Sequence, residues 1–175
     1  GDNNKIRENV TINRGTAAKG KTCVGSGNLL MESVHVAHDA FVGNDCIIGN
    51  GTKLAGEIII DDHAIISANV LMHQFCRVGG YTMVGGGTRF SQDIPPYTIC
   101  AREPVAYCGL NLVGLRRRGF SNELIENIHN TYRIIYQGGV PLNEALQKVR
   151  EEVPASPEIN YIIEFIENSK RGFVH

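Results

Sequence analysis

A large apolar side chain occurs at every sixth residue through the middle of this chain, twelve times in succession. In most of these hexads the next residue is glycine, alanine or serine. A period of six fits neither the two-residue alternation of an ordinary strand nor the 3.6-residue repeat of a helix. Hexapeptide repeats are typical of a parallel β-helix, in which short strands and turns alternate along stacked coils. The repeated positions are Val24, Leu30, Val36, Val42, Ile48, Leu54, Ile60, Ile66, Met72, Val78, Val84 and Phe90.

Three hexads make one coil of eighteen residues, so residues 23–94 supply four coils. Each strand is expected to pair with the strand one coil away, about 4.8 Å along the axis, with the repeated apolar residue pointing inward. Ile6 and Ile12 keep the same frame, whereas residues 14–22 are polar and are expected to form a loop that leaves the coil. The chain begins inside a repeat and without Met, so we expect earlier coils in the natural protein.

The repeat ends at residues 94–97, where two consecutive prolines cannot continue a strand ladder. Residues 98–119 show no clear period and are expected to form an irregular connection. Helical patterns follow, with Ser121 as an N-cap, glycines 138 and 139 as a stop, a second helix over 141–153, and Ser156 as the next N-cap. The expected fold is therefore a β-repeat followed by α structure: a parallel β-helix (1–97), a connector (98–120) and a three-helix domain (121–175).

Composition excludes several classes of protein. A net charge of -1 argues against a free-standing nucleic-acid binder, and no run of eighteen apolar residues is present to span a membrane. The five cysteines are odd in number and form no CxxC pair. They are expected to be reduced core thiols of a cytosolic protein.

The richest polar interruption of the repeat is the HVAHD segment at residues 35–39. Neutral imidazole, with an ordinary pKa of about 6.5, can take a proton from an alcohol that is itself far too weakly acidic to ionise. His38 is therefore a candidate general base, with Asp39 as its orienting partner. Adjacent strand residues face opposite sides, so the pair works only at a corner of the coil. A plain surface histidine is the alternative.

Because one coil contains eighteen residues, the residue directly above any position on the next coil is found by adding eighteen to its number. Gly56 is expected directly above His38, and Gln74 above Gly56. A bare glycine amide can approach a reacting carbonyl and stabilise an oxyanion, although Gly56 can equally be a turn residue. His73 replaces the usual small residue of its hexad and is expected to point outward, either towards a ligand or into solvent.

Two further clusters carry weaker signals. His35 and His38 with His63 or His73 can be imagined as zinc ligands, but no spacing is diagnostic, so no metal is expected. Arginines 116–118 form the strongest charge cluster. Forked guanidinium donors suit a diphosphate, and a solvated run of charge is the alternative. Asn111 is a plausible contact to a base or sugar.

Several motifs together resemble one family. HVAHD (35–39), LAG (54–56), MHQFC (72–76), QDIPPY (92–97) and GLRRRGF (114–120) are similar to the bacterial UDP-N-acetylglucosamine acyltransferases of lipid A synthesis. IRENVTI (6–12) and RGT (14–16) fit as well. The resemblance covers essentially the whole chain and matches the C-terminal two-thirds of that family.

The resemblance implies a left-handed β-helix that assembles as a cytoplasmic homotrimer with active sites between subunits. The implied reaction moves an (R)-3-hydroxyacyl group from acyl carrier protein to the 3-hydroxyl of UDP-N-acetylglucosamine. No cofactor or metal is implied, because the phosphopantetheine arrives on the carrier protein. In family terms His38 is the base with Asp39 beside it, and the Gly56 amide stabilises the oxyanion. The implied substrate contacts are His35, His73, Gln74, Asn111, Arg117 and Arg118.

Met83 and Gly86 lie where the family measures its acyl chain. Gly86 has no side chain to block the groove, which predicts a long acyl chain. Two positions depart from the family: Glu57 stands where better-known members carry histidine, and Asn13 where they often carry another. Glu57 lies one coil above Asp39, so like charges are expected to crowd there.

Two other functions remain open at this point. The related N-acyltransferase that acts later in the same pathway has a similar fold and base, but the Arg-rich entry to the helices argues against it. A β-helix that only binds or assembles is the alternative of another class, and it predicts no loss of function on changing His38.

Overall fold

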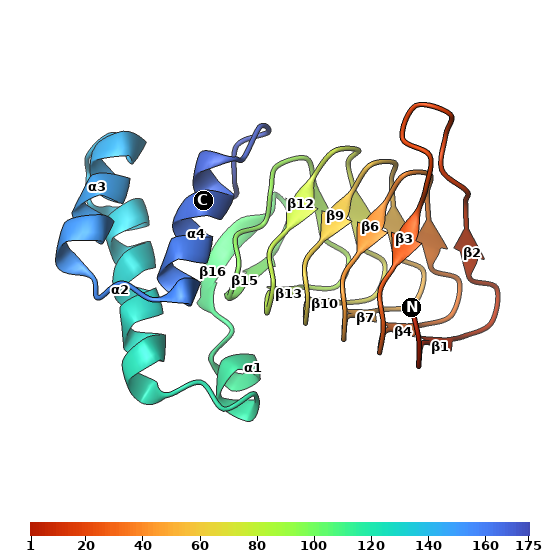
Figure 1. Cartoon of the computed structure of the whole chain (residues 1–175), viewed down its shortest axis with the longest axis horizontal. Helices are drawn as coiled ribbons and strands as arrows, with labels where there is room; N and C mark the ends of the chain where they lie inside the picture. The colour runs from red at the N-terminus through yellow and green to blue at the C-terminus, as the bar shows by residue number, and fades with distance from the viewer.

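The computed structural model describes all 175 residues and is a parallel β-helix followed by helices (Figure 1). The period of six is confirmed, because one two-residue strand forms in each hexad. These strands are β1 (Lys5–Ile6), β2 (Thr11–Ile12), β3 (Cys23–Val24), β4 (Leu29–Leu30), β5 (His35–Val36), β6 (Phe41–Val42), β7 (Ile47–Ile48), β8 (Lys53–Leu54), β9 (Ile59–Ile60), β10 (Ile65–Ile66), β11 (Leu71–Met72), β12 (Arg77–Val78), β13 (Met83–Val84) and β14 (Arg89–Phe90).

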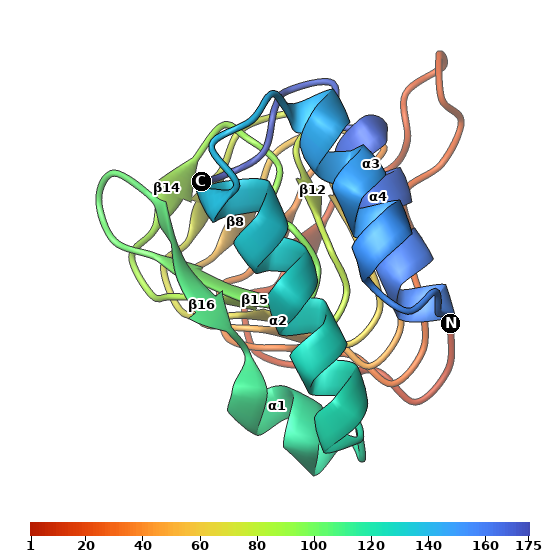
Figure 2. The ribbon, with the colours of Figure 1, turned by 90° about the vertical axis from the view of Figure 1, so that its left-hand side faces the viewer.

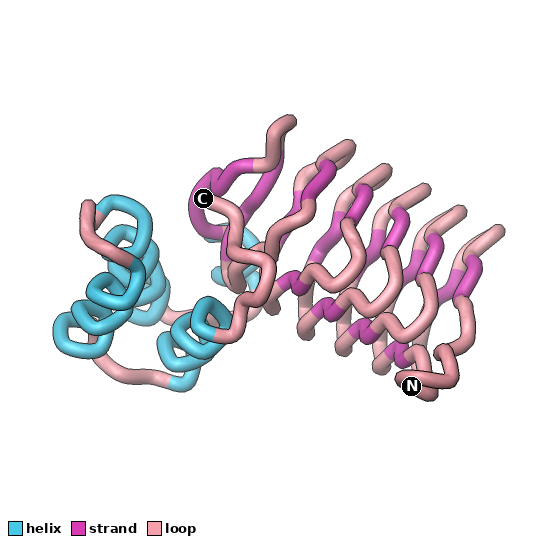
Figure 3. Tube along the Cα trace, turned by 90° about the horizontal axis from the view of Figure 1, so that it is seen from above, coloured by secondary structure: helices cyan, strands magenta, loops and turns pink.

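The strands stack into three sheets, and Figure 3 shows the successive coils lying side by side. The first sheet begins β1-β4-β7-β10-β13, the second has the order β14-β11-β8-β5-β2, and the third has the order β12-β9-β6-β3. Partners lie eighteen residues apart, as where Val36 pairs with Leu54. The first coil is longer, because Thr11 pairs with His35. The extra residues belong to the predicted loop between β2 and β3, which protrudes at the upper right of Figure 1.

The inward residue of nearly every hexad is buried, and these side chains form one continuous apolar core inside the coils. Corners are made by two turn residues, the second of which has a positive φ, such as 60° at Asp39 and 57° at Glu57. This left-handed conformation reverses the chain sharply without a helix. Side chains of consecutive corner residues therefore need not point to opposite faces.

The prediction of an irregular connection over residues 98–119 is wrong. β15 (Thr98–Ala101) continues the first sheet beside β13, and β16 (Ala106–Leu110) pairs antiparallel with β15. A short helix, α1 (Leu112–Arg117), follows. The prolines do not end the sheet because they occupy the corner before β15, where no ladder hydrogen bond is required of them. Thr98 and Cys100 then point into the core.

The three predicted helices are confirmed as α2 (Asn122–Gln137), α3 (Leu142–Glu152) and α4 (Pro157–Glu167). Ser121 and Ser156 cap α2 and α4 as expected. The helices cover one end of the coil stack (Figure 2). The C-terminal tail returns to the same end, where the Val174 N–H donates to the Asp93 carbonyl at 2.9 Å and its side chain joins the coil core.

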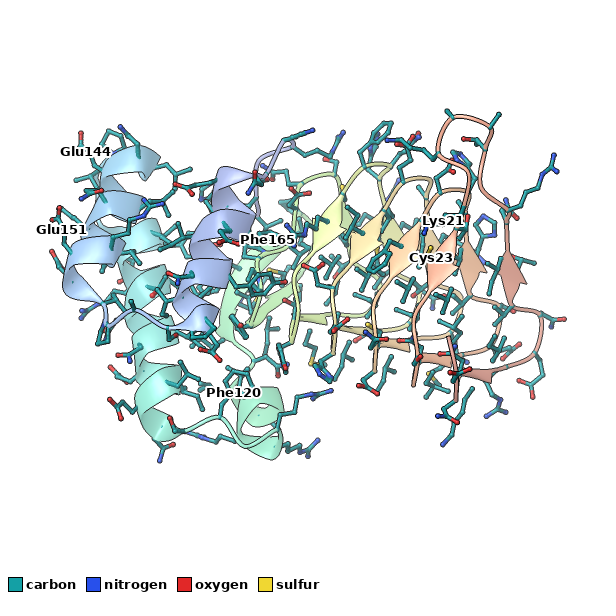
Figure 4. All side chains as sticks on the ribbon, in the orientation of Figure 1. Lys21, Cys23, Phe120, Glu144, Glu151 and Phe165 are labelled. Atoms are coloured by element: carbon teal, nitrogen blue, oxygen red, sulfur yellow. The ribbon has the colours of Figure 1, made fainter.

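Aromatic residues attach the helices to the coils. The Tyr132 hydroxyl donates to the Pro96 carbonyl at 2.7 Å, and the Arg77 guanidinium lies 4.5 Å from the ring centre of Phe165. Figure 4 shows Phe165 on α4 facing the β-helix and Phe120 beside α1. None of the helices is both long enough and apolar enough to cross a membrane.

Candidate active site

His38 and Asp39 form the corner between β5 and β6, the position required for them to act together. Nδ1 of His38 lies 2.8 Å from Oδ2 of Asp39. A carboxylate can only accept, so Nδ1 carries the proton in the neutral ring and Nε2 is left as the acceptor. The His38 side chain is 41% exposed, whereas that of Asp39 is 2% exposed. His38 is therefore a candidate base that faces solvent, and its bond to Asp39 fixes which ring nitrogen carries the proton.

The loop over residues 13–22 forms one wall of a groove beside His38. The open groove has a volume of about 880 Å³ and is lined by His38 together with Ile12, Asn13, Arg14, Gly15, Thr16, Ala17 and Gly20. Asp39 ties this loop down at two points, since Oδ1 accepts from the Thr16 N–H at 2.9 Å and its own N–H donates to Thr22 Oγ1 at 2.8 Å. Asp39 thus both orients the His38 ring and holds the loop that forms the groove wall.

The ionised state of Asp39 is favoured by these contacts. Withdrawal of its carboxyl from water acts to raise the pKa, but hydrogen bonds from His38 and the Thr16 N–H outweigh it, and the pKa of Asp39 lies below its ordinary value. Asp39 therefore remains an anion through the pH range in which imidazole titrates.

The direction of this shift predicts how stability depends on pH. Because the folded pKa lies below the ordinary 3.8, the bonds of Asp39 stabilise the fold fully above pH 3.8, and this contribution is lost as the pH falls through the folded value. Urea unfolding should show Asp39→Asn to be less stable than the parent at neutral pH, with a gap that narrows below pH 3.8. A gap independent of pH would contradict the role of the ionised carboxylate.

Gly56 lies directly against the His38 ring. A Cβ atom at this position would be 2.6 Å from Cε1 and 2.7 Å from Nε2 of His38. Gly56 has no positive φ, so glycine is required here by the ring and not by the backbone. Its N–H makes no hydrogen bond within the chain. The Gly56 N–H is therefore a free hydrogen-bond donor at the corner where Nε2 of His38 is the free acceptor.

The stacking read from the period of eighteen is confirmed along this corner. The Glu57 N–H donates to the His38 carbonyl at 3.1 Å, and the Phe75 N–H donates to the Gly56 carbonyl at 3.2 Å. Gln74 is therefore placed above Gly56, as predicted. Along the axis of the coils, this corner therefore carries the His38 imidazole, the Gly56 backbone amide and the Gln74 carboxamide, one on each successive coil.

His35 and His73 lie on β5 and just after β11, which belong to the same sheet. Nδ1 of His35 is 2.7 Å from Thr11 Oγ1. His73 is exposed, and its Nδ1 donates to the Gln74 carbonyl at 2.9 Å, which leaves Nε2 free. Both are on the side of the coil that leads to the His38 corner. Their contact with substrate stays a prediction.

The residues around α1 are not gathered at the His38 corner within this chain. Asn111 is buried: its Oδ1 caps α1 by accepting from the Gly114 N–H, and its Nδ2 donates to the Tyr81 carbonyl at 2.9 Å. Arg117 and Arg118 are exposed at the end of α1, and the Arg118 guanidinium lies 5.8 Å from the ring centre of Tyr81. The roles of all three in nucleotide binding stay predictions.

The two residues predicted to measure the acyl chain lie away from the His38 corner, on β13 and in the turn that follows it. Met83, at the start of β13, is 36% exposed. Gly86 is the first residue of the corner between β13 and β14, and a Cβ there would meet the Ala68 carbonyl at 3.3 Å. A side chain at position 86 would therefore begin in close contact with the coil below.

The structure adds residues that the sequence pattern did not single out. Thr16 and Thr22 bind Asp39, and Lys19 lies 3.5 Å from the Glu57 carboxylate. The loop breaks the six-residue period, so no periodic signal marks its contacts. The charge crowding predicted between Asp39 and Glu57 is reduced, because Lys19 lies beside the Glu57 carboxylate and Asp39 is held by hydrogen bonds from His38 and the Thr16 N–H.

No three side chains of His, Cys, Asp or Glu gather closely enough to hold a metal ion. His35 instead contacts Thr11, His38 contacts Asp39, and His63 packs at a tilt against Tyr81 with a ring-centre distance of 4.7 Å. The absence of a metal requirement stays a prediction.

Comparisons with known proteins show which proteins this chain is similar to. The family description "Udp N-acetylglucosamine O-acyltransferase; Domain 2" matches residues 93–174. A UDP-N-acetylglucosamine acyltransferase from Bacteroides fragilis (LpxA) is 72% identical, with a TM-score of 0.95 over 98% of this chain and 68% of that chain.

The enzymes from Francisella novicida and Arabidopsis are 37% and 33% identical, with TM-scores of 0.93 and 0.94. The match to the Francisella enzyme covers 98% of this chain and 63% of that enzyme. The match to the Arabidopsis enzyme covers 99% of this chain and 64% of that enzyme. The chain thus spans about two-thirds of these relatives, and the left-handed β-helix expected from the motifs is confirmed.

Proposed function

Because the chain belongs to the UDP-N-acetylglucosamine O-acyltransferase family, we propose that it transfers an (R)-3-hydroxyacyl chain from acyl carrier protein to the 3-hydroxyl of UDP-N-acetylglucosamine, the first step of lipid A synthesis. The observation that carries the proposal is the free Nε2 of His38 beside the bare amide of Gly56. Together they supply the two groups that acyl transfer to an alcohol requires.

The proposed step is a direct displacement. Nε2 of His38 takes the proton of the sugar hydroxyl as its oxygen bonds to the thioester carbon. The carbonyl oxygen becomes an oxyanion, which accepts a hydrogen bond from the Gly56 N–H. Collapse breaks the carbon–sulfur bond, and the imidazolium returns the proton to the leaving thiolate. Asp39 stays ionised and stabilises the imidazolium. The phosphopantetheine is part of the carrier protein, so no other cofactor enters the step.

We propose that the active unit is a homotrimer. In the register of the first sheet, Leu29, Ile47, Ile65 and Met83 follow one another on its outer side. A stripe of this kind is expected to be buried in an assembly, and the family motifs imply active sites between adjacent subunits. Light scattering should give the mass of three chains.

The substrate contacts are proposed from the family motifs. His35, His73 and Gln74 would contact the sugar or the acyl chain, and Arg117 and Arg118 would hold the phosphates with forked donors. Asn111 would act mainly by fixing the start of α1, where its side chain is bonded. Five free thiols suit a reducing compartment, which supports the bacterial cytoplasm.

Met83 and Gly86 predict the chain length of the preferred donor. Position 86 has no side chain to close the path of the acyl chain, so donors longer than ten carbons should give the higher kcat/KM. The measurement is a comparison of acyl carrier proteins loaded with chains of graded length. A preference for ten carbons would contradict the assignment.

Mass spectrometry of the product formed from UDP-N-acetylglucosamine and acyl carrier protein tests the reaction. An ester on the sugar hydroxyl supports it. Amide formation on an amino-sugar acceptor would instead indicate the related N-acyltransferase, and no transfer at all would leave a non-catalytic scaffold. Neither alternative is favoured by an observation on this chain.

A further inference from the structure

A second carboxylate stands at the corner of the proposed base. Glu57 follows Gly56 directly, and its N–H donates to the His38 carbonyl at 3.1 Å. Its backbone has the same left-handed conformation as Asp39 one coil below. The Glu57 side chain is 26% exposed, so its charge is only partly screened by water. Without a nearby cation, the negative charge of Glu57 would favour the imidazolium form of His38.

Lys19 reaches this carboxylate from the loop. Its Nζ lies 3.5 Å from Oε2 of Glu57, although Lys19 itself is 60% exposed. The loop that carries it is fixed on both sides by Asp39, through the Thr16 N–H and Thr22 Oγ1. The stretch of backbone that carries Lys19 is therefore held on both sides.

The charges around His38 come from three elements. Asp39 lies on its own corner, and Glu57 on the corner above. Arg14 and Lys19 belong to the loop that shares the groove. The imidazoles of His35 and His73 lie along the adjoining sheet, His35 bonded to Thr11 and His73 to the Gln74 carbonyl. Among these groups, only Asp39 contacts the His38 ring.

We propose that Lys19 is a positioning residue whose charge offsets that of Glu57, so that Asp39 remains the main carboxylate acting on the His38 ring. The inference rests on the proposed function of His38. A loop cation beside Glu57 reduces the negative charge near His38 without touching the bond between His38 and Asp39.

Removing either partner should move the titration of His38, in opposite directions. Lys19→Met leaves Glu57 unbalanced and should raise the acid limb of the kcat/KM profile by about half a pH unit. Glu57→Gln leaves Lys19 unbalanced and should lower it by a similar amount. The double variant should return to the parent profile. Lys21→Met, on the same loop, is the matched control and should move the limb much less.

The imidazole titration of His38, followed by NMR in the same purified proteins, separates this inference from the proposed reaction. Opposite shifts that cancel in the double variant support the charge pairing, even if turnover were absent and the proposed function had failed. Shifts of the same sign, an unchanged titration in both single variants, or an equal shift from Lys21→Met would overturn it. A purely structural latch predicts about the same loss of stability in each single variant and in the double variant, without a change of titration, because every one of them breaks the same contact.

Discussion

Replacing His38 with Ala should lower kcat by about 10²–10⁴-fold, because the variant loses the group proposed to take the proton of the acceptor hydroxyl. KM should change much less, since the ring is required mainly in the transition state. The measurement is steady-state transfer from a saturating acyl carrier protein donor, in the native assembly. The thermal midpoint should stay close to the parent value, because the side chain is 41% exposed.

A matched control distinguishes base loss from general damage. His129 is an exposed histidine on α2, and His129→Ala should retain parental turnover. Retained turnover in His38→Ala would favour a scaffold role. A loss of the same size in both variants would show that the assay reports folding and not chemistry.

Replacing Gly56 with Ala should lower kcat by about 10²-fold or more. The new Cβ would lie 2.6 Å from Cε1 of His38, well inside contact distance, so the half-exposed ring must swing out of the groove. Displacement of a reacting group by about 1 Å can have an effect of this size. The backbone of Gly56 is compatible with alanine, so the thermal midpoint should barely change.

The double variant His38→Ala, Gly56→Ala tests the stated cause. If the methyl group acts by displacing the ring, the loss from Gly56→Ala should disappear once the ring is absent. A further loss of similar size in the double variant would place the effect on the Gly56 amide itself. Full activity of Gly56→Ala would contradict the close packing of the two residues.

The candidate site divides into a part that the repeat predicts and a part that it does not. Adding eighteen residues correctly placed Gly56 over His38 and Gln74 over Gly56. The same addition predicted crowding between Asp39 and Glu57, but the structure pairs each with a different partner. Lys19, which pairs with Glu57, and Thr16 and Thr22, which also bind Asp39, lie on the loop, where the period is interrupted and spacing carries no information about contacts.

The sequence by itself determined the coil, the inward core, the stacking of the corner residues and the three main helices, because each follows from a local period or a capping residue. Only the tertiary structure decided that residues 98–110 extend the first sheet and that the loop is tied to Asp39 and Glu57. These features depend on pairing between segments far apart in the chain, which leaves no periodic trace in the residues themselves.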